Sequence, residues 1–262
     1  MLSANGKLWS DRGLPPELFL RGIAMADIST PDFQQILAHP VLAYEEGLRF
    51  FRGAGLMNET LRRLASDLES HEIAYCVIGA VALNQHGYQR FTHDIDLLMT
   101  REGLKQFTEQ MLGRGYRPAF TGATKTFRST AENVPIEVIL SGEYPGDGKP
   151  KSVVFPDPSE NSVEIDGVKT ITLEKLVELK LASGMTGLGR RKDLADVQEL
   201  IRVRRLDAAF AQRIDLSVRD VFNELREELV EARAQRLGPH REGDQQEGDH
   251  QEGDHQEGDE NV

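Results

Sequence analysis

Residues 75–100 read YCVIGAVALNQHGYQRFTHDIDLLMT. An apolar, β-prone run at residues 73–78 predicts a strand that ends at Gly79. Residues 80–85 predict a short helix, and residues 94–99 predict a second strand. A strand that passes through a glycine into the start of a helix presents backbone N–H groups, which can cradle a phosphate.

Two carboxylates, separated by one residue, lie in the second of these strands. Side chains alternate along a strand, so Asp94 and Asp96 share one face, while Ile95 and Leu97 take the other. Two neighbouring carboxylates repel each other, and the pair needs a cation or solvent to stay ionised. Asp-x-Asp alone is therefore typical either of a metal site or of an edge strand with a solvated polar face.

A third acid, Glu137, interrupts the apolar strand predicted at residues 136–140, where a buried-strand pattern gives no structural reason for a charge. On a neighbouring strand it would face Asp94 and Asp96. Clustered oxygen ligands suit Mg²⁺, whose shell is normally completed by a nucleotide phosphate. Three acids on two strands would form a two-metal clamp for in-line phosphoryl transfer.

The rest of the chain predicts a mixed α/β half followed by a helical half. Residues 143–160, which are rich in proline, predict a loop. An Asp166-Gly167 pair predicts a tight hairpin turn. The other predicted elements are helices at 57–70 (with Asn58 as N-cap), 101–112, 173–183, 192–203 and 218–237, and strands at 116–120, 126–129, 163–165 and 168–171.

Net charge and composition exclude several classes of protein. The chain has 262 residues and a formal net charge of -12. This acidic balance argues against a protein that coats nucleic acid, because phosphate neutralisation needs a basic face. No apolar run is long enough for a spanning helix or a signal sequence, and we expect a cytoplasmic protein with no membrane partner. The single cysteine, Cys76, excludes an intramolecular disulfide and is expected in the core.

Most of the acidity lies at the C-terminus. Residues 241–262 hold nine carboxylates and one arginine in a five-residue repeat, with no apolar residue before Val262, and predict disorder. At the other end, the proline-containing residues 1–40 show only a short candidate helix near residues 16–26. We therefore expect four parts, which are an N-terminal extension (1–54), an α/β core (55–171), a helical part (172–238) and a disordered tail (239–262).

The central motifs resemble the nucleotidyltransferase fold of the polymerase-β-like superfamily. The match rests on Gly79-Ala80, Asp94-x-Asp96 and Glu137. The fuller pattern looks like the bacterial minimal branch, which includes AbiEii-type toxin enzymes. That pattern comprises His86-Gly87-Tyr88, Arg90, Thr92, Leu179-Lys180-Leu181 and Arg191-Lys192-Asp193-x-x-Asp196. The resemblance covers about residues 58–203, and it implies a mixed nucleotidyltransferase sheet with flanking helices.

The resemblance implies a reaction and a role for each motif residue. A nucleoside triphosphate, such as ATP, would give its NMP to a hydroxyl on a protein, tRNA or small molecule, with release of pyrophosphate. Asp94 and Asp96 would hold Mg²⁺, or Mn²⁺, and Glu137 would bind the catalytic metal and help to deprotonate the acceptor. Gly79 and Ala80 would meet the triphosphate through backbone amides. A toxin role would add a cognate antitoxin as partner.

Two departures from the family pattern keep an alternative open. The family usually has glycine or serine where this chain has Ala80, and its third acid is more often Asp than Glu. A nucleotide-binding or partner-binding module with little turnover is therefore the second interpretation. A basic group at residues 190–192, Arg202, Arg204 and Arg205 would attract RNA or nucleotide, or form a solvated helix face.

Other polar residues near the motifs have one or two expected roles. Lys180 lies on an apolar helical stripe, so it reaches nucleotide phosphates or extends its amine to water. Asp193 and Asp196 pair with Lys180 or start the following helix. Arg90 holds phosphate or pairs with an acid. His86 is expected to cap a turn or form a core hydrogen bond, and His93 is expected to face solvent.

Overall fold

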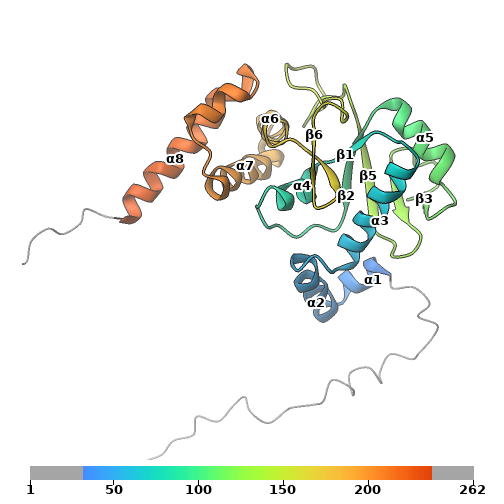
Figure 1. Cartoon of the computed structure of the whole chain (residues 1–262). Coiled ribbons are helices and arrows are strands. Elements are labelled where there is room, and N and C mark those ends of the chain that lie inside the picture. The colour runs from blue at the N-terminus through green and yellow to red at the C-terminus, as the bar shows by residue number, and fades with distance from the viewer. Residues whose placement is uncertain (1–31, 238–262) are drawn as a thin grey trace, which may run out of the picture.

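The computed structural model describes residues 32–237, and these form the predicted mixed α/β fold with flanking helices and a helical C-terminal part (Figure 1). Seven strands make one sheet in the order β3-β4-β5-β2-β1-β7-β6. The strands are β1 (Tyr75–Val77), β2 (Ile95–Met99), β3 (Tyr116–Pro118), β4 (Thr126–Ser129), β5 (Pro135–Leu140), β6 (Ser162–Ile165) and β7 (Val168–Ile171). All seven lie within or overlap the strands predicted from the sequence.

The centre of the sheet pairs strands that are far apart in the chain. β2 lies antiparallel to β1 and parallel to β5, and β1 lies parallel to β7. In the β2 and β5 pair, Asp96 is directly opposite Glu137. The sheet register therefore places two of the predicted site acids on adjacent strands.

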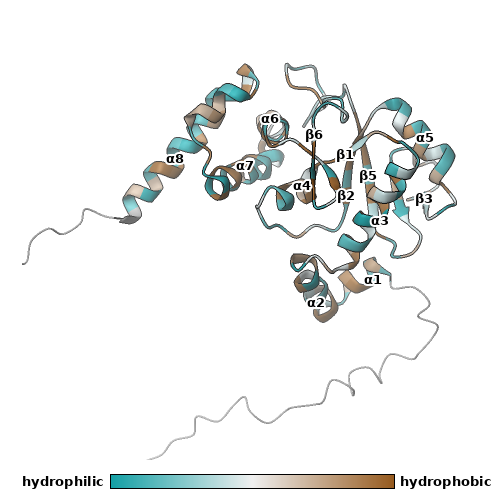
Figure 2. Cartoon of the chain, viewed as in Figure 1, coloured by the Kyte–Doolittle hydropathy of each residue, from teal (hydrophilic) through white to brown (hydrophobic). Residues whose placement is uncertain are grey.

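Helices cover both faces of the sheet, and each face has its own apolar core. α3 (Leu56–Ser70) and α5 (Arg101–Met111) pack on the face that includes Val77 and Leu97. α4 (Gly79–Gln85), α6 (Leu173–Gly184) and α7 (Arg191–Arg204) pack on the face that includes Cys76 and Leu98. Figure 2 shows hydrophobic residues on the strands between these layers. Cys76 is fully buried, as expected.

Two helices precede the core and are not predicted by the sequence. α1 (Phe33–Ala38) and α2 (Pro40–Phe51) lie beside α3, and Phe33 and Phe50 are buried in the first core. The predicted N-cap of α3 at Asn58 is wrong, because the helix begins after Gly55. The buried carboxylate of Glu46 accepts a hydrogen bond from the Leu56 amide at 2.6 Å, so α2 supplies the cap from ten residues away.

A set of hydrogen bonds joins α1 and α3 to the loop before β5. The Phe33 amide donates to the Glu132 carbonyl at 2.8 Å, and the Glu132 side chain accepts hydrogen bonds from Thr60 and Arg63. Burial alone would raise the pKa of the Glu132 carboxyl, but the hydrogen bonds from Arg63 and Thr60, with the Arg63 charge, outweigh it and lower the pKa below its usual value.

We expect Glu132→Gln to make the free energy of unfolding depend less on pH in the acid range. Because the folded pKa is lowered, the charged Glu132 contributes stability above its unfolded pKa, and this is lost as the pH falls through the folded value. Urea unfolding at several values between about pH 6 and pH 3 would show the variant losing less stability than the parent chain over the acid part of this range. An equal loss in both proteins would contradict this role of Glu132.

The C-terminal half is helical, as predicted. α6 and α7 are followed by short 3-10 turns, which include η3 (Ala208–Arg213) and η4 (Leu216–Val218), and by α8 (Arg219–Leu237). No helix within residues 32–237 combines the length and apolar character needed to cross a membrane. The candidate helix at 16–26 and the tail predicted at 239–262 lie outside the described residues.

Candidate active site

One cavity of about 490 Å³ opens between the sheet and the helices α4, α6 and α7. Seven residues to which the sequence assigns a catalytic, metal or nucleotide-binding role line it. These residues are Gly79, Ala80, Arg90, Asp94, Asp96, Glu137 and Lys180. Residues up to 101 positions apart in the chain therefore meet in one place, although their chemical roles remain predictions.

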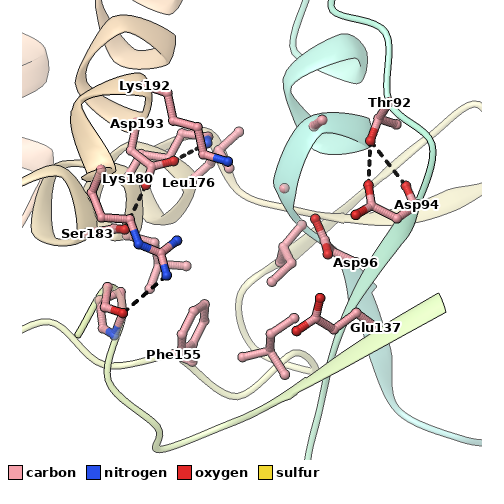
Figure 3. Close-up of a pocket in the computed structure, with 18 of the residues that line it drawn as sticks. Thr92, Asp94, Asp96, Glu137, Phe155, Leu176, Lys180, Ser183, Lys192 and Asp193 are labelled. Atoms are coloured by element: carbon pink, nitrogen blue, oxygen red, sulfur yellow. Dashed lines mark hydrogen bonds and ion pairs between the residues drawn. The ribbon is translucent and has the colours of Figure 1, made fainter. Parts of the chain in front are cut away.

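Three carboxylates form one side of this cavity (Figure 3). Asp96 is on β2, Glu137 is opposite it on β5, and Asp94 immediately precedes β2. The Thr92 hydroxyl donates to Asp94 Oδ1 at 2.6 Å, so the Asp94 side chain is held by a residue two positions earlier. The three acids thus face the same space from two neighbouring strands.

The surroundings of the Asp96 carboxyl change its acidity. Burial, together with the negative charges of Asp94 and Glu137, raises the pKa of Asp96 to about 7. Lys180 and Lys192 act in the opposite direction but do not cancel the effect. A carboxyl group with this pKa is stabilised in its charged form by any cation that enters the cavity.

The environment of Glu137 differs from that predicted. The sequence places this residue in a strand with a buried-strand pattern, whereas β5 alternates, with Ile136 and Val138 buried on one face and Glu137 exposed on the other. The charge is accommodated because the cavity leaves this part of the sheet uncovered. Its exposure gives Glu137 access to a ligand.

A glycine is required at position 79 by the backbone conformation and by the nearby side chain of Asp96. Its φ is +63°, in the left-handed region that glycine adopts most easily, and the chain turns there from β1 into α4. A Cβ at this position would lie 1.9 Å from Asp96 Oδ2. The absent side chain therefore leaves room for the Asp96 carboxylate against the start of α4.

The opposite side of the cavity carries basic side chains, among which Lys180 of α6 is balanced by carboxylates of α7. Lys180 Nζ donates to Asp193 Oδ1 at 3.1 Å and to Asp196 Oδ2 at 2.7 Å, and all three side chains are buried. Arg90 Nη1 donates to the same Asp196 oxygen at 2.9 Å. The predicted pairing of Lys180 with Asp193 and Asp196 is confirmed, and the alternative in which its amine extends to water is wrong. Asp193 also lies in the first turn of α7.

We expect Asp196→Asn to destabilise the fold by about 3 kcal/mol, since it leaves two cations short of a buried partner. Lys180 keeps Asp193, which places the value at the lower end of the usual range. Urea unfolding would measure the loss. Glu199→Gln, which removes an exposed pair with Arg202, is the matched control and should cost less than about 1 kcal/mol. Equal costs in the two variants would contradict this description.

Several cavity residues were not singled out by the sequence. Ser183 donates to Asp193 Oδ2 at 2.7 Å and completes the polar cluster. Tyr144 and Phe155 also line the cavity. These residues come from the predicted loop and from the end of α6, where no periodic pattern marks a ligand-facing position.

The histidines take structural or peripheral positions. The buried His86 side chain bonds through Nε2 to the Ile171 carbonyl at 2.8 Å, which is the predicted core hydrogen bond. Burial lowers the pKa of His86 and favours its neutral form. His93 is exposed, as predicted, and lies at the cavity edge.

No protein-family model matches the chain, and no curated protein matches it. Among solved structures, it is similar to an antigenic nucleotidyltransferase-like protein from Paracoccidioides brasiliensis, with 17% identity, a TM-score of 0.40, and coverage of 67% of this chain and 87% of the other. It is also similar to JHP933 from Helicobacter pylori, with 14% identity, a TM-score of 0.37, and coverage of 68% and 92%.

A third similar structure is ANT(2'')-Ia in complex with adenylyl-2''-tobramycin, with 14% identity, a TM-score of 0.41, and coverage of 65% of this chain and 95% of the other. The three TM-scores are below 0.5, and the identities are below 20%. Similarities at this level assign neither a family nor an activity, and we infer the function from the site itself.

Proposed function

We propose that this protein is a Mg²⁺-dependent nucleotidyltransferase that transfers NMP from a nucleoside triphosphate to a hydroxyl acceptor and releases pyrophosphate. The observation that carries the proposal is the charge separation across one cavity. Asp94, Asp96 and Glu137 face it from the sheet, and Lys180 and Lys192 line it from the helices. A triphosphate with bound cations needs carboxylates to hold the cations and basic side chains to contact the phosphates.

The donor set fits a hard divalent cation such as Mg²⁺ or Mn²⁺. Carboxylate oxygens are its preferred ligands, and a bound cation would offset both the burial and the repulsion from Asp94 and Glu137 that raise the pKa of Asp96. Within residues 32–237, no three His, Cys, Asp or Glu side chains already stand grouped as a metal site. When bound, the cation would polarise the phosphoryl group and neutralise its developing charge.

The side chains of this protein have separate tasks in the proposal. Asp94 and Asp96 would hold the cations, while Glu137, the most exposed of the three acids, would also accept the proton of the attacking hydroxyl. Backbone amides at Gly79 and Ala80 would contact the triphosphate. Lys180 and Arg90 would supply positive charge to it, with Asp196 fixing both cations in place.

The reaction is tested by incubating the full chain with Mg²⁺ and each of four labelled nucleoside triphosphates, together with protein, tRNA and small-molecule acceptors. Labelled acceptor and an equal amount of pyrophosphate are expected. A mass increase of one NMP would then identify the acceptor. Hydrolysis without labelled acceptor, or acceptor labelling without pyrophosphate, would contradict the proposed reaction.

A second candidate is a nucleotide-binding or partner-binding module with little turnover. The observation that favours it is Ala80 at the start of α4, where a methyl group offers no hydroxyl to a phosphate. Calorimetry with Mg²⁺ and each nucleotide separates the two functions. Binding without pyrophosphate release for any acceptor would favour the module.

A toxin role with a cognate antitoxin is a further part of the proposal, and it concerns the biological setting rather than the chemistry. We place the activity in the cytoplasm, where nucleoside triphosphates and tRNA are available. Expression with and without the adjacent gene would test the role. Growth arrest that the adjacent gene relieves is expected, and arrest that is independent of the Asp94 and Asp96 carboxylates would contradict it.

A further inference from the structure

The outer face of α2 carries an apolar stripe. Val41, Tyr44, Leu48 and Phe51 are 56%, 68%, 43% and 45% exposed. Their spacing of three, four and three residues places them on one side of the helix. Figure 2 shows hydrophobic residues along α2, at the periphery of the molecule. Single exposed apolar residues are common, but a continuous exposed stripe marks a surface that packs against another segment.

The stripe ends at a cavity of about 250 Å³. Phe51 belongs to both, and the cavity is lined by apolar residues that include Phe50, Met57 and Leu61 and by polar residues that include Asn58 and Gln85. The inner side of α2 is fixed by packing of Phe50 against Phe91, with ring centroids 5.2 Å apart, and by the Glu46 cap on α3. The stripe is therefore held rigidly in an outward position and leads to a hollow that would accept an apolar side chain.

We propose that residues 14–26 of this same chain cover the stripe, with residues 16–26 as a helix antiparallel to α2. These residues lie outside the described part, which begins at Asp32. Asp32 caps the start of α1, and the six-residue α1 packs beside α2, so the preceding segment starts about 9 Å, the length of α1, from the junction with α2. The five residues 27–31 span at most about 17 Å, which is enough for the chain to reverse direction.

The length and pattern of the segment match the stripe. An 11-residue helix is about 16 Å long, and the 12-residue α2 is about 18 Å long. Pro16, Phe19, Leu20 and Ile23 recur at the spacing of one helical face. In the antiparallel direction, Leu14 falls beyond the end of α2, beside the cavity at Phe51.

The charges on the two helices are complementary in this direction. Antiparallel pairing brings Glu17 toward Arg49 of α2 and Arg52 just after it, and Arg21 toward Glu45, and these three side chains are exposed. The parallel direction would place Glu17 near the start of α2, away from both arginines. A segment of the same chain is also favoured over a second copy, because a short tether gives it an effective concentration in the millimolar range.

Hydrogen exchange of the full chain tests the proposal. Amides of residues 18–26 should exchange at least about tenfold more slowly than in an unstructured peptide of the same sequence. Tyr44→Ser with Leu48→Ser should remove this protection. Leu216→Ser on η4, where the side chain is 76% exposed, is the matched control and should retain it. Unchanged exchange in β5 would show that each variant is folded.

A charge reversal tests the direction of packing. Arg21→Glu should reduce the protection of residues 18–26, and Glu45→Arg in the same chain should restore it. The proposal is overturned if these amides exchange at the unstructured rate, or if the stripe variant leaves their protection unchanged. It is also overturned if the protection grows with protein concentration along with a doubled mass, because a second copy would then be the occupant.

Discussion

Replacing Asp94 and Asp96 together with asparagine is expected to reduce Mg²⁺-dependent NMP transfer by about a thousandfold or more, because cations and positioned charge supply most of the acceleration in phosphoryl transfer. Asparagine keeps the shape of each side chain and removes the charge that holds the cation. The same change removes a buried charge and the repulsion between Asp94, Asp96 and Glu137, so the folded chain should be no less stable. Transfer of labelled NMP and urea unfolding measure the two effects.

Asp166→Asn is the matched control for this double variant. Asp166 is exposed in the turn between β6 and β7, and its φ of +51° suits asparagine, so neither transfer nor stability should change. Full transfer by the double variant would exclude the proposed roles of Asp94 and Asp96. Loss of transfer together with unfolding would instead make them structural residues.

The positions of the carboxylates follow from local features that the sequence contains. The two-residue period of β2 puts Asp94 and Asp96 on one face, and the glycine after β1 marks the turn into α4. The same period also brings Glu137 of β5 to that face, once the two strands pair in parallel. The sheet order that makes them neighbours depends on pairing between distant strands, which the period itself does not specify.

The features missed by the sequence are those that depend on distant partners. Lys180 has a position on an apolar stripe in the sequence, but its two carboxylate partners on α7 decide where its amine lies. The cap of α3 comes from Glu46 on a helix that has no strong sequence signal of its own. The residues of the loop before β6 lack a periodic pattern, and only the folded chain brings Tyr144 and Phe155 to the cavity.

Because Gly79 lies close to Asp96, Gly79→Ala is expected to lower the rate of NMP transfer by about a hundredfold or more. The new methyl group would occupy the position of Asp96 Oδ2, and the carboxylate would have to rotate away from the start of α4. A displacement of about 1 Å in a positioned group costs on this order in rate. The backbone also loses about 1–2 kcal/mol of stability, because alanine is strained at a φ of +63°.

Gly113→Ala separates these two effects. Gly113 has a φ of +78°, so alanine there should lower the stability of the fold by a similar amount. A Cβ at this position, however, meets nothing within 4 Å. Both variants should unfold at lower urea concentrations than the parent chain, while only Gly79→Ala should lose transfer. If Gly113→Ala lost transfer equally, the effect would be one of stability. If Gly79→Ala transferred NMP at the parental rate, Asp96 would not need its present position, and its role in holding the cation would be excluded.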